Sequence, residues 1–294
     1  MKKFFAVLLT ILGVLGLASC TSTKTSFKAK GKKVTDDDFA ERLADAYISM
    51  SKNLGDYDKL PDVEIETYTK RKGTYTRNYD AGYKETSKYT EENSLTLKYD
   101  ADSDLITIKG TGKSAEEYKT PSRTGKENSS SKRDTVYQDK GNGVAIVDKV
   151  TKTYSVSSSN MELTGYYEFS QYLNDITEVL GELVEFDEDY MTFYVSGDSV
   201  FTVVYEKDRS EEHTEVTVQL VLKDDEMSVI AEYKDSYTVD YDDYIFEGEY
   251  SKYTSTSIKF KKVSVKAVDL TKYTKISYND ENDYYDENNY YDYY

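Results

Sequence analysis

The segment VTVQLVLKDDEMSVIAEY (residues 216–233) decides the fold class of this chain. Apolar side chains occupy every second position on both sides of its centre: Val216, Val218, Leu220 and Leu222, then Met227, Val229, Ala231 and Tyr233. A period of two is typical of β-strands that bury one face. The acidic residues 224–226 between the two runs predict a tight turn. The segment therefore predicts a β-hairpin in an antiparallel sheet.

The same alternation extends the predicted sheet in both directions along the chain. It covers residues 191–265, with further turns expected at 196–198 and 242–243, and it also covers much of 63–156. Residues 113–134 interrupt it with lysine, serine, glycine and glutamate and few apolar side chains. We expect a loop there.

Two stretches have the period of an amphipathic helix. Thr35 caps the first, three aspartates follow in its first turn, and its apolar stripe is Phe39, Leu43, Ala46, Met50 and Leu54. The second begins near Ser159, which has capping-box spacing to Glu162, and its stripe is Phe169, Leu173, Ile176, Leu180 and Leu183. The order helix, meander, helix, meander predicts an α+β fold, with a long, curved, half-barrel-like antiparallel sheet and both helices on one face.

Composition excludes several function classes. The chain has 294 residues, with 55 acidic and 38 basic side chains and a formal charge of -17, which argues against nucleic acid as a partner. Its single cysteine and single histidine exclude Cys/His zinc sites, disulfide frameworks and Cys–His nucleophile pairs. Tyrosine, with 31 residues, supplies rings that can bury apolar area while their hydroxyls stay hydrated.

The N-terminus carries a targeting signal. Lys2 and Lys3 precede a 14-residue apolar run at 4–17, which is too short to span a bilayer and is typical of a secretory signal. The run ends in Leu17-Ala18-Ser19-Cys20, which resembles the lipobox of bacterial lipoproteins. The resemblance implies cleavage between Ser19 and Cys20 and acylation of Cys20 with a diacylglyceryl group and palmitate. The mature chain would then be anchored on the extracytoplasmic side of the cell membrane or outer membrane.

These patterns divide the chain into four parts. Residues 1–19 are the signal peptide, 20–34 a lysine-rich lipidated tether, 35–276 the folded body and 277–294 a tail. The body is expected to be a single domain, and the alternative is two helix-plus-meander units at 35–156 and 157–276. The tail contains only Asp, Glu, Asn and Tyr from residue 279 on, so we expect it to be disordered.

The order of the elements resembles the half-barrel of LolA-type and LppX-type lipoprotein carriers. This resemblance implies a non-catalytic binding protein that accommodates a lipid or another apolar ligand. The alternative is a structural or interaction lipoprotein that contacts a cell-envelope partner through its tyrosine-rich sheet and acidic tail. Both hypotheses place the protein at the membrane through the lipid on Cys20, without a cofactor.

Three patterns look like chemical motifs. Residues 110–114, GTGKS, lack the earlier glycine and the following helix of a phosphate-binding loop. Asp100, Asp102 and Asp104 have the spacing of a calcium loop without its glycine and glutamate, so a turn between two strands is expected, with a weak calcium site as the alternative. His213 begins a strand with no nucleophile elbow near it and is interpreted as a surface histidine. We therefore predict no catalytic residue, no metal ligand and no enzyme activity.

Replacing Cys20 with alanine should abolish labelling of the protein with radioactive palmitate, because the acylated thiol is then missing. The precursor should also remain uncleaved by the lipoprotein signal peptidase, which gel mobility reports. Continued labelling of the Cys20→Ala variant would contradict the assignment.

Deleting residues 279–294 should change the free energy of unfolding by less than about 1 kcal/mol, because no core-facing pattern runs through them. Binding to cations or basic partners should weaken, most clearly at low salt, where charges are least screened. Thermal denaturation measures the first effect, and a sharp fall in the melting temperature would show that the tail belongs to the folded body.

Overall fold

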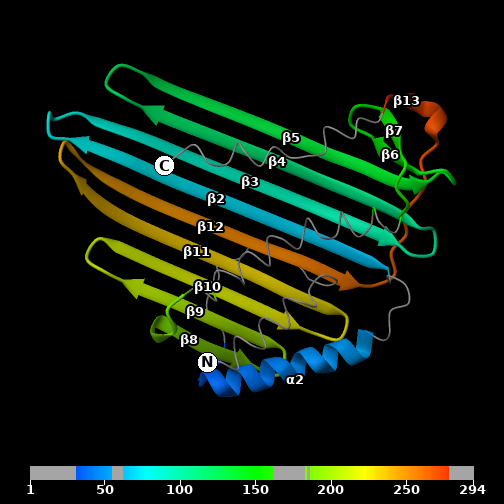
Figure 1. Cartoon of the computed structure of the whole chain (residues 1–294), viewed down its shortest axis with the longest axis horizontal. Coiled ribbons are helices and arrows are strands. Elements are labelled where there is room, and N and C mark those ends of the chain that lie inside the picture. Colours follow the sequence, from blue (N-terminus) through cyan, green and yellow to red (C-terminus); the bar gives the residue numbers. More distant parts are fainter. Residues whose placement is uncertain (1–30, 55–61, 162–163, 165–182, 184–185, 278–294) are drawn as a thin grey trace.

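One 13-stranded sheet forms the body of the protein (Figure 1). The structure, a computed structural model, describes residues 31–54, 62–161, 164, 183 and 186–277. Neighbouring strands are antiparallel throughout, except for the parallel pair at one edge, β7 and β13. The order across the sheet is β1-β8-β9-β10-β11-β12-β2-β3-β4-β5-β6-β7-β13. The predicted large antiparallel sheet is therefore confirmed.

The strands differ greatly in length, and the longest ones lie in the middle of the sheet. Their bounds are β1 (Lys32–Val34), β2 (Val63–Tyr79), β3 (Lys84–Asp100), β4 (Leu105–Lys119), β5 (Thr124–Asp139), β6 (Val144–Asp148), β7 (Thr153–Ser157), β8 (Met191–Ser196), β9 (Val200–Asp208), β10 (Glu212–Leu222), β11 (Glu226–Tyr241), β12 (Tyr244–Phe260) and β13 (Thr274–Lys275). Two short 3-10 helices, η2 (Glu188–Tyr190) and η3 (Leu270–Lys272), complete the described elements together with the helix α2 (Asp36–Leu54).

The hairpin predicted from residues 216–233 is confirmed as β10 and β11. Leu222 pairs with Met227 beside the turn, and the register continues without a break to Glu212 and Tyr237. The turns expected at 196–198 and 242–243 also lie between paired strands, β8–β9 and β11–β12. The alternation thus identified these strands because each buries one face.

The expected loop at residues 113–134 is wrong. Apart from the turn at 120–123, these residues belong to β4 and β5, which pair from Leu105↔Gln138 to Lys119↔Thr124. Most side chains in this part of the hairpin are exposed or only half-buried. With water on both faces, neither face selects apolar residues, so the period of two disappears although the backbone is fully paired.

The first predicted helix is confirmed as α2, which packs on the sheet beside β8 and β9. Phe39 and Leu43 are fully buried, as expected from the apolar stripe. The ring of Phe39 lies 5.1 Å from that of Phe193 and 5.7 Å from that of Phe201, measured between centroids. The Thr35 hydroxyl accepts a hydrogen bond from the Asp38 amide at 3.2 Å and so caps the helix.

Within the described residues, the structure shows one α-helix, α2, where two amphipathic helices were expected. The second expected helix, at 159–183, lies outside the described residues except for residues 159–161, 164 and 183. Of these, Met161 and Leu183 are buried in the hydrophobic core. None of the helices in the described ranges has the length and apolar character needed to cross a membrane.

The lysine-rich segment at 20–34 ends in a strand. Lys32–Val34 form β1, which pairs with β8 at the edge of the sheet. The residues before position 31, including Ser19 and Cys20, lie outside the described part of the chain.

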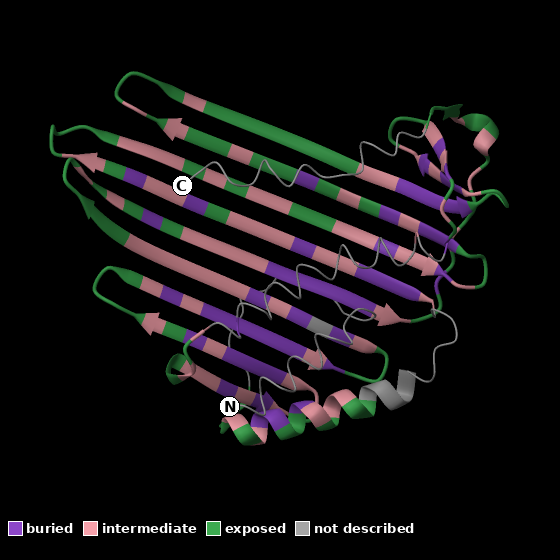
Figure 2. Cartoon of the chain, in the orientation of Figure 1, coloured by how far each residue is buried: buried purple, intermediate pink, exposed green. Residues whose placement is uncertain are grey.

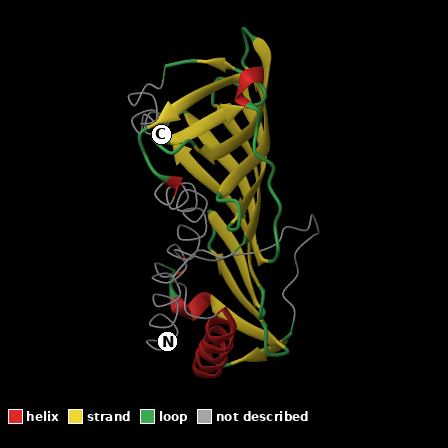
Figure 3. Ribbon diagram, turned by 90° about the vertical axis from the view of Figure 1, so that its right-hand side faces the viewer, coloured by secondary structure: helices red, strands yellow, loops and turns green. Residues whose placement is uncertain are grey.

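The buried residues occupy one end of the long strands. In Figure 2 they gather near α2 and where β2, β3 and β12 approach the loops beside β6 and β7, while the opposite hairpin ends are exposed. Ile65, Leu97, Ile108 and Ile258 form a fully buried row across neighbouring strands. The side view shows a twisted sheet with α2 against one side at its lower end (Figure 3). Long strands that continue beyond the core create the surfaces described next.

Candidate binding surfaces of the sheet

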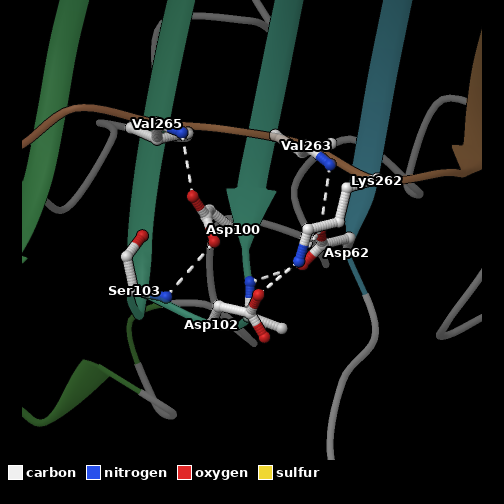
Figure 4. A network of polar contacts seen from close by, with 8 residues as sticks. Asp62, Asp100, Asp102, Ser103, Lys262, Val263 and Val265 are labelled. Atoms are coloured by element: carbon white, nitrogen blue, oxygen red, sulfur yellow. Dashed lines mark hydrogen bonds and ion pairs between the residues drawn. The ribbon is translucent and has the colours of Figure 1, made fainter.

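The three aspartates with calcium-loop spacing lie at the end of β3 and in the turn that follows it, as expected, and they face different partners. Figure 4 shows Asp100 and Asp102. Asp100 accepts hydrogen bonds from the amides of Val265, at 2.9 Å, and Ser103, at 3.2 Å. Asp102 pairs with Lys262, and Asp104 accepts a hydrogen bond from the Tyr99 hydroxyl at 3.2 Å. Within the described ranges, no group of three His, Cys, Asp or Glu side chains could hold a metal ion.

Asp100 works together with Asp62 to hold the segment that follows β12. The carboxylate of Asp62 accepts hydrogen bonds from the amides of Ala101 and Val263, both at 2.8 Å. The segment 261–265 is therefore attached across the ends of β2 and β3 by backbone amides (Figure 4). We call it the strap.

The amide of Val265 lowers the pKa of Asp100, and this effect outweighs the burial that would raise it. Asp100 is 5 % exposed, so its ionised form depends on these hydrogen bonds. A nearby carboxylate, Glu64, behaves similarly. Burial would raise its pKa, but hydrogen bonds from Lys261 and Lys98 lower it.

The other two motif-like patterns, at residues 110–114 and at His213, are parts of strands in the sheet. Residues 110–114 lie inside β4 and pair on both sides with β3 and β5, so they form no phosphate-binding loop. His213 stands at the start of β10, with its Nδ1 3.6 Å from a carboxylate oxygen of Asp208, and its side chain is 40 % exposed. These are the surroundings of a surface histidine.

The first candidate surface is a cluster of aromatic rings at the exposed end of the long strands. Its rings lie on the β2–β3 and β11–β12 hairpins. We call it the tip cluster: Tyr75, Tyr79, Tyr83, Tyr89, Tyr237, Tyr241, Tyr244 and Phe246. The register places its strand residues on the same face as the core, because pairs such as Tyr79↔Tyr244 continue the rows of Ile65↔Ile258.

Ring contacts connect the tip cluster across four strands. Tyr75 stacks with Tyr89 and Phe246, each at a centroid distance of 6.1 Å. Nearer the turns, Tyr79 stacks with Tyr83 at 4.2 Å and contacts Tyr244 at 5.2 Å. Such pairs contribute about 0.5–1.5 kcal/mol each beyond their buried area. The rings therefore hold one another in a preformed arrangement.

Arg77 joins the two groups of rings. Its guanidinium carbon lies 5.7 Å from the ring centre of Phe246 and 6.0 Å from that of Tyr244. Nη1 of Arg77 lies 3.7 Å from the carboxylate of Glu85, and that carboxylate accepts a hydrogen bond from the Tyr79 hydroxyl at 3.1 Å. The cluster thus presents aromatic area together with fixed polar groups.

Glycines beneath the rings allow tyrosines to lie across the strands. Gly73 pairs with Tyr89, and Gly248 pairs with Tyr237. A Cβ on either glycine would overlap the partner ring. Gly125 and Tyr118 repeat the arrangement on β5 and β4. A glycine in a strand often marks such a close approach, so these glycines were the sequence signal that could have located the cluster.

The second candidate surface is a hollow on the opposite face of the sheet. We call this face of the sheet the polar face. It has a volume of about 540 Å³ and spans β2, β3, β4 and β5. Two cross-strand rows form most of its lining: Lys70, Glu92, Lys113 and Ser130, and beside them Lys72, Thr90, Ala115 and Asn128. Sequence analysis missed this site because its residues come from four strands, and the parts of β4 and β5 that line it were expected to be a loop.

Comparisons with known proteins give no family for this chain. No protein-family model matches it, and no curated protein matches it at a significant level. Among solved structures, it resembles the translocator domain of the autotransporter NalP from Neisseria meningitidis, with 7 % identity over 74 % of this chain and 97 % of that one and a TM-score of 0.20. OccK7 from Pseudomonas aeruginosa gives 6 % identity, coverage of 60 % and 59 %, and a TM-score of 0.17. TM-scores this low carry no argument about fold or function.

Replacing Asp100 with alanine should lower the free energy of unfolding at neutral pH by about 1–3 kcal/mol, because the part-buried Val265 amide loses its acceptor. The pKa of Asp100 is lowered in the folded state. Its contribution is therefore complete above the ordinary pKa of aspartate and is lost as the pH falls through the lowered value. The stability difference between wild type and variant should narrow in acid. Urea denaturation at several pH values measures it, and a constant difference would contradict the assigned role.

Proposed function

We propose that this chain is a non-catalytic lipoprotein, anchored outside the cytoplasm through Cys20, that binds an envelope protein through the tip cluster. The observation that carries the proposal is an aromatic surface at the far end of the sheet that includes exposed rings. Tyr83 and Tyr241 are 42 % and 48 % exposed. Tyrosine and arginine dominate the residues that contribute most to binding at protein interfaces, because they bury large areas with few rotatable bonds.

The charges around the tip cluster support a basic partner. On the ring-bearing face and in the two turns, these hairpins carry four acidic residues, namely Asp80, Glu85, Asp242 and Asp243. One basic residue, Arg77, lies among them, whereas Lys84, Asp240 and Glu247 belong to the opposite face. The surface is therefore acidic around its rings, and complementary charge would increase the association rate of a lysine- or arginine-rich protein surface.

The hollow on the polar face does not favour an apolar ligand, because it is lined by charged, hydroxyl and amide side chains with a single alanine. The half-barrel with a second helix at 159–183, on which the lipid-carrier hypothesis rests, stays a prediction. The interaction hypothesis needs neither an enclosed apolar cavity nor a cofactor.

Photocrosslinking in cells tests the proposal. A photoreactive amino acid at position 83 or 241 should crosslink to a protein partner that mass spectrometry identifies. The same residue at position 150 or 190 should not, although Val150 and Tyr190 are exposed to a similar degree, 47 % and 40 %. Equal crosslinking at all four positions, or none at the tip, would overturn the proposal.

Binding of the purified partner should then weaken by about tenfold or more in the double variant Tyr83→Ser, Tyr241→Ser, as expected for the loss of aromatic anchors. Val150→Ser, Tyr190→Ser is the matched control and should bind normally. The dissociation constant of the wild type should rise with salt if the partner is basic. An apolar molecule that copurifies with the soluble protein, together with unchanged binding by the tip variant, would favour the carrier hypothesis instead.

A further inference from the structure

The polar face is divided into a basic and an acidic half. Alternation and register assign each side chain of β2–β5 and β9–β12 to one of the two faces. On β2–β5 the polar face receives six acidic residues (Glu64, Glu66, Glu92, Asp100, Glu117 and Asp134) and ten lysines (Lys70, Lys72, Lys84, Lys88, Lys98, Lys109, Lys113, Lys119, Lys126 and Lys132). The formal charge of this half is ten minus six, or +4, in a chain of charge -17.

The neighbouring half has the opposite sign. On β9–β12 the polar face receives two lysines, Lys234 and Lys259, and eight acidic residues: Glu206, Asp208, Glu215, Glu226, Glu232, Asp240, Glu247 and Glu249. Its formal charge is two minus eight, or -6. Because β12 pairs with β2, the boundary between the halves runs along the middle of the sheet.

The hollow lies within the basic half, and its shape follows from side-chain size. Thr90, Ala115 and Ser130 are short, whereas Lys70, Lys72 and Lys113 stand around them. Lys70 lies 3.6 Å from Glu92. Lys72 and Lys113 are exposed and make no ion pair with any residue in the described ranges. Two ammonium groups beside a polar depression are suited to acidic groups of a ligand.

We propose that this hollow binds the carboxylate or sulfate groups of an anionic polysaccharide. The lysines supply charge, and the Thr90, Asn128 and Ser130 side chains supply hydrogen-bonding groups for sugar hydroxyls. The lining contains no aromatic ring or arginine on which a nucleic-acid base could stack. Ala115 is the one apolar side chain in its lining.

The acidic half determines how such a polymer can lie. A polyanion that crossed from β2 to β12 would meet like charges, which disfavour that path. The bound polymer would therefore stay over the basic half, β2–β5, and would not cross to β12. This inference does not depend on the tip cluster, because the two surfaces lie on opposite faces of the sheet and share no residue.

Heparin is a suitable probe for the experiment, with dextran as the neutral polysaccharide and single-stranded DNA as the other polyanion. The soluble protein from residue 21 onward should bind heparin in calorimetry at low salt and should lose this binding as salt increases. It should not bind dextran, and it should bind DNA much more weakly than heparin. Equal affinity for DNA and heparin, or no heparin binding, would overturn the proposal.

Two sets of variants separate the hollow from the general charge of the face. The triple variant Lys70→Gln, Lys72→Gln, Lys113→Gln should bind heparin about tenfold more weakly or worse, since each lysine loses an ionic contact. The matched variant Lys88→Gln, Lys119→Gln, Lys132→Gln removes the same charge from the same half but leaves the hollow intact. It should bind with nearly the wild-type affinity. Equal weakening by both triples would overturn the assignment to the hollow.

A third variant tests the hollow without removing a lysine. Ala115→Glu places a carboxylate in the depression and should abolish heparin binding by occupying it and repelling the ligand. Ala115→Ser should retain binding. Thermal denaturation of every variant shows whether the sheet is intact, and unchanged heparin binding by a folded Ala115→Glu variant would overturn the proposal.

Discussion

The pairing of β2 with β12 is the interaction on which the rest of the structure depends. It runs without a break from Val63↔Phe260 to Tyr79↔Tyr244. At one end it aligns Ile65 with Ile258 in the core, and at the other end it brings together rings of the tip cluster. Because side chains alternate between faces, a slip by one residue would move the core residues to the polar face and the lysines to the core. The core, the tip and the hollow therefore share one register.

Beyond the core, cross-strand contacts replace burial as the source of order. Serine and threonine hydroxyls meet between strands, as in Ser94 with Thr111 at 2.9 Å and Ser114 with Ser129 at 2.8 Å. Each favourable pair contributes about 0.2–1 kcal/mol. Polar strands with water on both faces specify their register weakly, and the tyrosines that lie over glycines distinguish one register from its neighbours. The same features that stabilise this part of the sheet also produce its two candidate surfaces.

The sequence predicts those parts of the fold in which one face is buried. The hairpin at 216–233 and the helix from Asp36 were predictable, because burial imposes a period on apolar residues. The hairpin at 105–139 was not, since its outer part is hydrated on both faces and shows no period. The two candidate surfaces depend on which residues become cross-strand neighbours. That information comes from register, which a single sequence does not contain.

The position of β12 also has a consequence for the time course of folding. Contacts such as Thr69 with Thr254 join residues 185 positions apart, and contacts this distant in sequence form slowly. Until β12 is in place, the meander of β2–β5 has an open edge at β2, where an unpaired strand could join another chain. The middle of β2 is Lys70-Arg71-Lys72. Lys70 and Arg71 pair with Glu92 and Glu91 of β3, each at 3.6 Å, and Lys72 makes no ion pair with a described residue. A positive charge in the middle of the open edge disfavours pairing with the same segment of a second copy, which is one way in which edge strands are kept from aggregating.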